Sequence, residues 1–95
     1  MLIHMVSFKY RPDVDEKSRR EHREKLGGLR SLESVADLRV GADVVGSARS
    51  YDTGLVVTFT DRAALDRYQQ DPQHVPVAKY GAGLSDHIVA VDFEV

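Results

Sequence analysis

The first ten residues of the chain contain a β-strand pattern in which both faces are largely apolar. Leu2–Tyr10 has the two-residue period of a strand, and the face opposite to Leu2 still carries Ile3 and Met5. The end of the chain, 86–95, shares this property, with valines on one face and an isoleucine and an alanine on the other. Sheets that are covered on one side only show a cleaner alternation of apolar and polar residues. These strands are therefore expected to form a sheet that needs cover on both faces.

A helix is predicted after the first strand, from about Val14 to the glycine pair 27–28. Asp13 and Glu16 are spaced as a variant of the capping box that starts a helix. Acidic residues precede basic residues by four positions, which is typical of a solvated helix face. His22 lies within this charged run and is expected at the surface or at the edge of the packing.

The rest of the chain completes the order βαββαβ. Segments 34–44 and 52–60 read as strands joined by a polar, glycine-containing connection, Asp61 can cap a helix over 62–70, and 86–95 is the last strand. This order predicts a single α+β domain over 2–95, a ferredoxin-like sandwich with an antiparallel sheet and the helices on one of its faces.

The uncovered sheet face predicts a partner. If the helices cover one face, every strand still leaves apolar residues on the other, which is a larger patch than soluble monomers usually expose. A chain of 95 residues also buries only roughly 60 to 65% of its unfolded surface. The simplest remedy is a second copy, so we expect a homodimer joined sheet against sheet, a dimeric α/β barrel.

Composition and motifs exclude several function classes. The net charge of −2 and the aromatic content of 7%, without a basic stripe, argue against a nucleic-acid partner. The absence of cysteine excludes disulfides and thiol chemistry but leaves the compartment open. There is no signal-peptide pattern and no apolar run of the ~18 to 20 residues that a membrane span needs, so a cytoplasmic protein without a membrane partner is expected. The four histidines lack metal-ligand spacing and no phosphate-binding glycine loop is present, so we expect neither a metal nor a cofactor.

The stretch YQQDPQHVPVAKY breaks one helix and starts another. Asp71 is suited to the N-cap of the second helix and Pro72 to its first position, which would put His74 at the third. Pro76 lacks an N–H and indicates either a kink or a start one turn later. Near a helix N-terminus the positive end of the dipole disfavours imidazolium, so His74 is predicted to stay neutral near pH 7.

Three side chains are candidates for a site in a cavity between sheet and helices. His74 and Tyr68 are the predicted catalytic residues: a neutral imidazole can remove a proton next to a carbonyl while a phenol donates to the enolate oxygen. His4 is the predicted substrate-binding residue, because a histidine in mid-strand either meets a ligand cavity or bonds to the facing strand. In the alternative interpretation all three are packing residues.

Three stretches together, IHMVSFKY, YQQDPQHVPV and IVAVDFEV, resemble the stress-responsive dimeric α/β-barrel (Dabb) family, in the right order and over essentially the whole chain. The resemblance implies a ferredoxin-like protomer whose sheet pairs with that of a second copy. One group of this family, the polyketide cyclases of the olivetolic acid cyclase type, closes linear poly-β-keto thioesters by aldol condensation. Its strand histidine, tyrosine and turn histidine match His4, Tyr68 and His74. Its first turn histidine is replaced by Asp71, and the tyrosine of its first helix has no counterpart.

The resemblance leaves several functions open, and with them whether the chain is an enzyme. The first is a protein that binds a small apolar or polyketide-like molecule, or a cofactor-free cyclase acting by enolisation and aldol chemistry. The second is a non-catalytic stress-response protein in which the same residues pack the barrel. The third is a cofactor-free or haem-acting monooxygenase of the wider dimeric barrel superfamily, which is less favoured because the chain has no tryptophan and no evident haem-ligand context.

Overall fold

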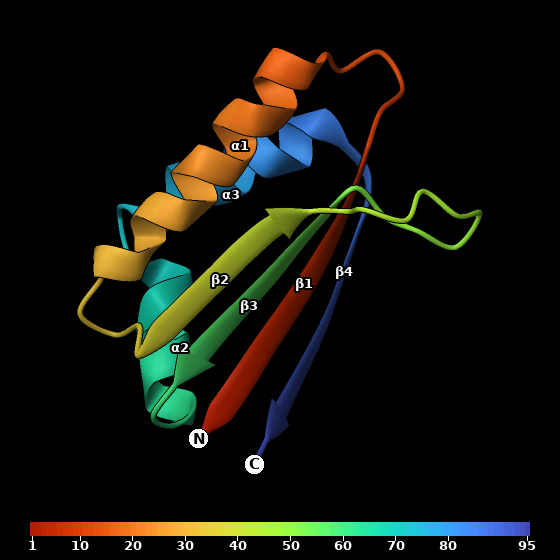
Figure 1. Ribbon diagram of the computed structural model, residues 1–95. Helices are drawn as coiled ribbons and strands as arrows, with labels where there is room; N and C mark the ends of the chain where they lie inside the picture. Colours follow the sequence, from red (N-terminus) through yellow and green to blue (C-terminus); the bar gives the residue numbers. More distant parts are fainter.

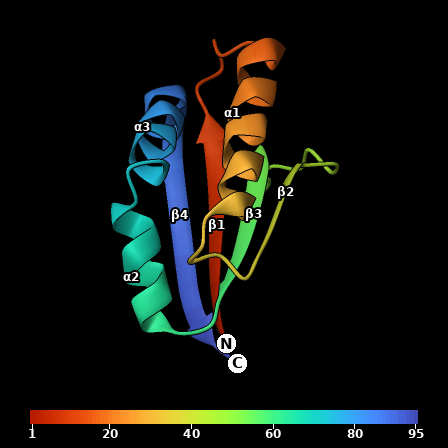
Figure 2. The same ribbon diagram turned by 90° about the vertical axis from the view of Figure 1, so that its left-hand side faces the viewer.

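The computed structural model describes residues 1–95 and consists of one four-stranded sheet with helices on one of its sides (Figures 1 and 2). The strands lie in the order β2-β3-β1-β4 and all neighbours are antiparallel. The elements are β1 (Leu2–Tyr10), α1 (Glu16–Gly28), the 3-10 turn η1 (Leu29–Ser31), β2 (Asp37–Ala42), β3 (Thr53–Phe59), α2 (Arg62–Gln70), α3 (His74–Leu84) and β4 (Ser85–Glu94). The predicted ferredoxin-like βαββαβ fold is confirmed.

The alternation in β1 decides which of its side chains enter the core. Leu2, Val6 and Phe8 are buried under the helices, whereas Met5 on the opposite face is 44% exposed. β1 pairs on one side with β3 and on the other with β4, so the first and last strands of the chain lie side by side (Figure 1). The core is one cluster of fifteen buried residues from β1, β2, β3, α1, η1 and α2, together with Val14 and Leu32 of the connecting segments.

The start of α1 differs from the prediction. Its N-cap is Asp15, whose carboxylate accepts a hydrogen bond of 2.8 Å from the Ser18 N–H, whereas Asp13 pairs with Arg11 on the surface. Val14 lies in the turn before the helix and is itself buried, with its N–H donating to the Arg11 carbonyl. The chain therefore turns inward at Val14 before helical geometry can begin, and the predicted capping by Asp13 is wrong.

The predicted strand 34–44 is shortened at both ends, to Asp37–Ala42. At its far end the Asp43 carboxylate accepts from the N–H groups of Val45 and Gly46, and Gly46 has the positive φ of 67° that glycine adopts most easily. This turn opens the connection to β3, which extends away from the sheet in Figure 1 and leaves Val44 94% exposed.

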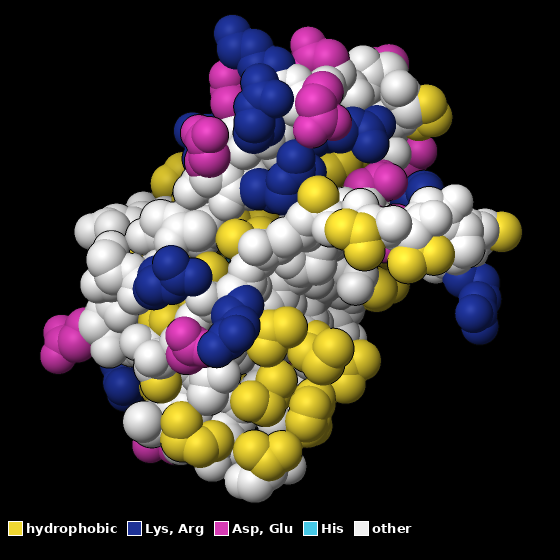
Figure 3. Space-filling model, in the orientation of Figure 1, with side chains coloured by type: hydrophobic (Ala, Val, Ile, Leu, Met, Phe, Trp, Pro, Cys, Tyr) yellow, Lys and Arg dark blue, Asp and Glu magenta, His cyan; other side chains and the backbone are white.

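The sheet face opposite to the helices is apolar and uncovered. Its exposed large side chains come from the two adjacent strands β1 and β4 and include Met5, Val89, Val91 and Phe93. Figure 3 shows hydrophobic side chains gathered over the lower part of this face. None of the helices has the length and apolar character that crossing a membrane requires.

Candidate functional site

One cavity of about 220 Å³ lies between the sheet and the helices, and it brings His4, Tyr68 and His74 together. His4 comes from β1, whereas Tyr68 and His74 come from the consecutive helices α2 and α3, more than sixty residues further along the chain. Ile88 and Ala90 of β4 line the same cavity and remain exposed, so the cavity opens beside β4. Most of the other lining side chains are apolar, and they come chiefly from the core between β1, β3 and α1.

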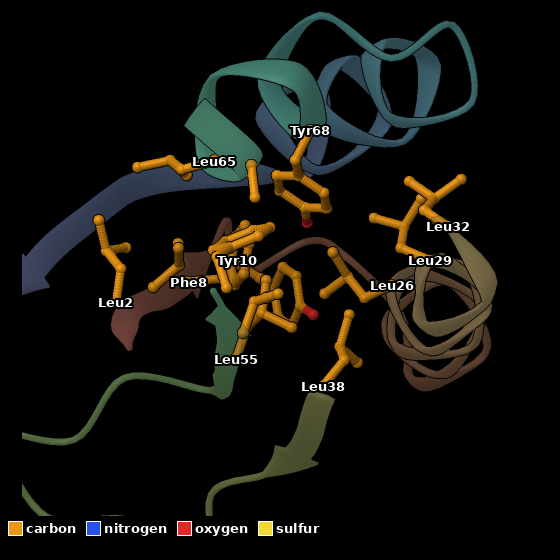
Figure 4. Packing of buried hydrophobic residues seen from close by; sticks show 14 of the residues in the cluster. Leu2, Phe8, Tyr10, Leu26, Leu29, Leu32, Leu38, Leu55, Leu65 and Tyr68 are labelled. Atoms are coloured by element: carbon orange, nitrogen blue, oxygen red, sulfur yellow. The ribbon is translucent and has the colours of Figure 1, made fainter. Parts of the chain in front are cut away.

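Tyr68 is fully buried and reaches from α2 into the space between helices and sheet (Figure 4). Its ring centroid lies 4.3 Å from that of His74, 5.1 Å from that of Phe59 and 6.1 Å from that of His4. Burial raises the pKa of Tyr68 to about 12. The phenol is therefore protonated at neutral pH and can donate a hydrogen bond to a ligand oxygen.

The position of His74 in its helix differs from the prediction. The main-chain carbonyl of Asp71 accepts from the N–H groups of His74 and Val75, at 2.9 and 3.0 Å, and its carboxylate accepts from that of Gln73 at 2.8 Å. Pro76 has no N–H to continue this pattern, so α3 begins only at His74, its first residue instead of its third. Asp71 caps the preceding turn, and its predicted place as N-cap of α3 is wrong.

His74 lies in a partly buried position that favours the neutral imidazole. Burial is the largest cause that lowers its pKa, and the nearby His4 lowers it further, against the opposing effects of the Gln69 backbone and of Asp71. Its Nδ1 is buried and has no hydrogen-bond partner. The predicted neutral state thus has a physical basis, but the main cause is desolvation, and the helix dipole on which the prediction rested is not needed for it.

His4 is held by a carboxylate that the sequence interpretation missed. The register of β1 and β4 places His4 opposite Asp92, and the His4 Nδ1 contacts the Asp92 carboxylate. A carboxylate on Nδ1 accepts a hydrogen bond from the ring and fixes its orientation. The signal was present in the alternation of β4, where Asp92 shares a face with Ile88 and Ala90, but the partner could be identified only from the register between strands.

The prediction that His22 lies at the surface or at the edge of the packing is wrong. Its side chain is fully buried and lines the same cavity as the three predicted residues. The α1 residues His22 and Leu26 are one turn apart and face the sheet, where the His22 ring meets Phe8 edge-on with centroids 4.7 Å apart. The Tyr10 hydroxyl lies 2.7 Å from its Nδ1. Burial, with a smaller effect of Arg23, lowers the pKa of His22 to about 4, so this histidine is also neutral.

The charged residues do not form a metal site in this structure. No group of three or more histidine, aspartate or glutamate side chains is arranged to hold an ion. The polar side chains that line the cavity are imidazoles, a phenol and an amide, which can form hydrogen bonds with an uncharged organic ligand.

Solved structures with the same architecture include proteins without an assigned function and one enzyme. A dimeric ferredoxin-like protein of unknown function from Thermobifida fusca superposes with a TM-score of 0.90 at 22% identity, over 99% of this chain and 90% of that one. A dimeric ferredoxin-like protein of unknown function from Jannaschia sp. CCS1 has a TM-score of 0.83 at 30% identity, over 99% and 98%. Hydroxynitrile lyase from Passiflora edulis has a TM-score of 0.89 at 17% identity, over 99% and 92%.

Sequence comparisons complete this result. No curated protein matches the chain. The sequence model of the stress responsive A/B barrel domain family matches residues 2–95, which is nearly the whole chain. With its ferredoxin-like fold and this match, the chain belongs to the stress responsive A/B barrel (Dabb) domain family.

Proposed function

We propose that the chain binds a small carbonyl compound in its cavity and catalyses proton transfer on it without a cofactor. The observation that carries this proposal is that His4, Tyr68 and His74 line one cavity. The ring centroids of His74 and Tyr68 lie 4.3 Å apart. His74 is a neutral imidazole with an unpartnered nitrogen, and Tyr68 is a protonated phenol. This pair has the protonation states that general base and hydrogen-bond donor require.

In the proposed reaction His74 removes a proton from the carbon next to the carbonyl. The electrons of the broken C–H bond form the carbon–carbon double bond of an enolate, and the negative charge passes to the carbonyl oxygen, to which Tyr68 donates a hydrogen bond. His4, held by Asp92 and lining the same cavity, is the proposed substrate-positioning residue. In an aldol step the enolate carbon forms a bond to a second carbonyl carbon, and the imidazolium returns its proton to the new alkoxide.

The cavity volume favours a compact substrate. Pockets for drug-sized ligands measure about 300 to 1,000 Å³, whereas this cavity measures about 220 Å³. A longer polyketide-like chain would have to extend through the open side, past Ile88 and Ala90. Small ketones are therefore the first compounds to test.

The test is the exchange of ketone α-protons in deuterated water, followed by NMR with octan-2-one. We expect the wild-type protein to accelerate this exchange and His74→Ala to lose most of the acceleration, about a hundredfold. His87→Ala, which removes an exposed histidine outside the cavity, is the matched control. Binding of the ketone without accelerated exchange would instead support a binding protein. A variant that loses stability with unchanged ketone binding would support the packing role.

A second candidate reaction is the cleavage of small cyanohydrins. The structural neighbour from Passiflora edulis is a hydroxynitrile lyase, and the small cavity suits such a substrate. Here His74 would take the hydroxyl proton, the electron pair of the broken O–H bond would form the second bond of the carbonyl, and the pair of the broken C–C bond would leave with cyanide, which then takes the proton from the imidazolium. Release of cyanide and benzaldehyde from mandelonitrile measures this activity, and its absence would leave enolisation as the proposal.

The proposed assembly is a homodimer joined through the uncovered sheet face. Val91 and Phe93 of β4 are 62% and 41% exposed on this face, next to Met5 of β1. Neighbours of the same fold are described as dimeric, which supports a second copy as the cover. We expect Val91→Asp to give a 10.6 kDa monomer by light scattering and Val75→Asp, at an exposed position of α3 on the helix side of the sheet, to leave the dimer intact. A monomeric wild-type protein would contradict the proposal.

A further inference from the structure

One end of the cavity, at His22 and Phe8, carries a polar group that the proposed reaction does not use. This end is called the inner end, and the end at Tyr68 and His74 the outer end. His22 lines the cavity together with His4, Tyr68 and His74, but it comes from α1 and takes no part in the proton transfer described above. We propose that His22 Nε2 is a second ligand anchor, which donates a hydrogen bond to an acceptor oxygen at the far end of a molecule whose reacting carbonyl lies at Tyr68 and His74. This inference rests on the proposed function for the location of that carbonyl.

The polar groups at the two ends of the cavity are far enough apart that only an elongated ligand can reach both. His22 packs on Phe8, and Phe8 and His4 lie on the same face of β1, four residues apart. At about 3.3 Å per residue their Cα atoms are roughly 13 Å apart along the strand. The side chains between the two ends are apolar and include Val6, Phe8, Leu26 and Leu55. A ligand that reaches both ends must therefore have an apolar middle.

The hydrogen bonds behind His22 determine what its free nitrogen offers. Arg23 donates to the Thr53 Oγ1 at 3.3 Å, Thr53 and Tyr10 are joined at 2.8 Å, and the Tyr10 hydroxyl lies 2.7 Å from His22 Nδ1. If Thr53 donates to Tyr10 and Tyr10 donates to Nδ1, both hydroxyl protons have an acceptor. The opposite direction would leave the buried Thr53 hydroxyl proton with none. The proton of the neutral His22 ring is therefore on Nε2, which makes this atom a donor.

Nothing in the chain accepts a hydrogen bond from this donor. Nε2 is buried and unpartnered, which is rare for a polar atom inside a protein. Gly81 of α3 packs beside it so closely that an added Cβ atom would come within 2.5 Å, so a residue without a side chain is needed on that side of the ring. An acceptor oxygen on a ligand at the inner end of the cavity would satisfy it. The expected ligand class is a small molecule with two oxygens on an apolar chain, such as a diketone.

The experiment compares diketones with matched monoketones. The affinities of heptane-2,6-dione, octane-2,7-dione, nonane-2,8-dione and decane-2,9-dione are measured by calorimetry or NMR titration against the 2-alkanones of equal chain length. One additional buried hydrogen bond should favour the diketone by about three- to tenfold, and only near the chain length that spans the two ends. Equal affinities at every length would overturn the proposal.

Two substitutions at the same position separate the ring nitrogens. The amide oxygen of His22→Asn can replace Nδ1 as acceptor for Tyr10 but leaves no donor at the place of Nε2, so the diketone preference should disappear. His22→Gln carries an amide N–H near the place of Nε2 and should keep part of the preference. If the diketone preference is the same in His22→Asn as in the wild-type protein, the role of Nε2 is contradicted.

A measurement on the wild-type protein does not depend on whether the variants fold. The ¹⁵N and ¹H shifts of the His22 Nε2–H group should move with the preferred diketone and stay in place with the matched monoketone. Unchanged shifts would overturn the proposal. The two proposals fail separately: diketone preference without α-proton exchange would refute the enolisation and keep the anchor, whereas exchange without diketone preference would do the reverse.

Discussion

The two ends of the cavity both hold a neutral histidine with a buried, unpartnered ring nitrogen, but they are built differently. At the inner end His22 is fixed by the Tyr10 hydroxyl, which is itself joined to Thr53. At the outer end Tyr68 and His74 lie ring to ring, and the Tyr68 hydroxyl takes no part in such a network. This difference predicts that substitutions at the inner end mainly lower stability, whereas substitutions at the outer end mainly affect the proposed proton transfer.

The largest expected effect is a loss of stability in acid that originates at the inner end. The pKa of His22 is lowered from 6.5 to about 4, so the unfolded chain binds a proton at this residue while the folded chain does not. Its contribution is fully present above pH 6.5 and is lost as the pH falls toward 4, about 3 kcal/mol in all. Urea unfolding between pH 7 and 4 measures it. In His22→Asn the free energy of unfolding should fall less steeply between pH 7 and 4, and an equal slope would show that His22 is not the residue responsible.

The next effect belongs to the outer end and concerns activity alone. Tyr68→Phe removes the donor to the enolate oxygen and should slow α-proton exchange of octan-2-one about a hundredfold. Because the hydroxyl is outside the network that holds His22, the free energy of unfolding should change by less than about 1 kcal/mol. A large loss of stability at unchanged exchange rate would assign Tyr68 to packing.

A smaller effect is expected where α3 meets the inner end. Gly81→Ala would bring its Cβ atom within 2.5 Å of His22 Nε2, so α3 or the ring must move, at a net cost of about 1 to 2 kcal/mol in unfolding free energy. Gly83→Ala is the matched control, because no atom lies within 4 Å of an added Cβ there. It should leave stability unchanged or raise it by up to about 1 kcal/mol through helix propensity. Equal behaviour of the two variants would show that α3 does not pack tightly on His22.

The smallest effect is expected from the second partner of the inner network. Tyr10→Phe leaves His22 Nδ1 and the Thr53 hydroxyl without their shared partner and should lower the unfolding free energy by about 1 kcal/mol. Tyr80→Phe, which removes a part-exposed bond to Glu21, should change it by less. Thermal unfolding of the two variants makes the comparison, and a larger loss for Tyr80→Phe would mean that the buried network contributes little.

Periodicity was sufficient to predict the fold and part of the site. The alternation of β1 placed His4 on the helix-covered face, and the apolar side of α2 placed Tyr68 toward the sheet, as the structure has them. The catalytic roles of Tyr68 and His74 stay predictions. His22 was assigned to the surface because its immediate neighbours in α1 are charged, although it lies one turn from Leu26 on the narrow stripe of the helix that faces the sheet.

The sequence by itself determined the order of the elements and the face on which each strand residue lies, because both follow from local periods of two and 3.6 residues. Only the tertiary structure decided which residues meet. The register of β1 with β4 joins His4 to Asp92, the packing of α1 on Phe8 buries His22, and Pro76 delays α3 until His74. The first two contacts join residues far apart in the chain, so they depend on strand register and helix orientation, which no local pattern specifies.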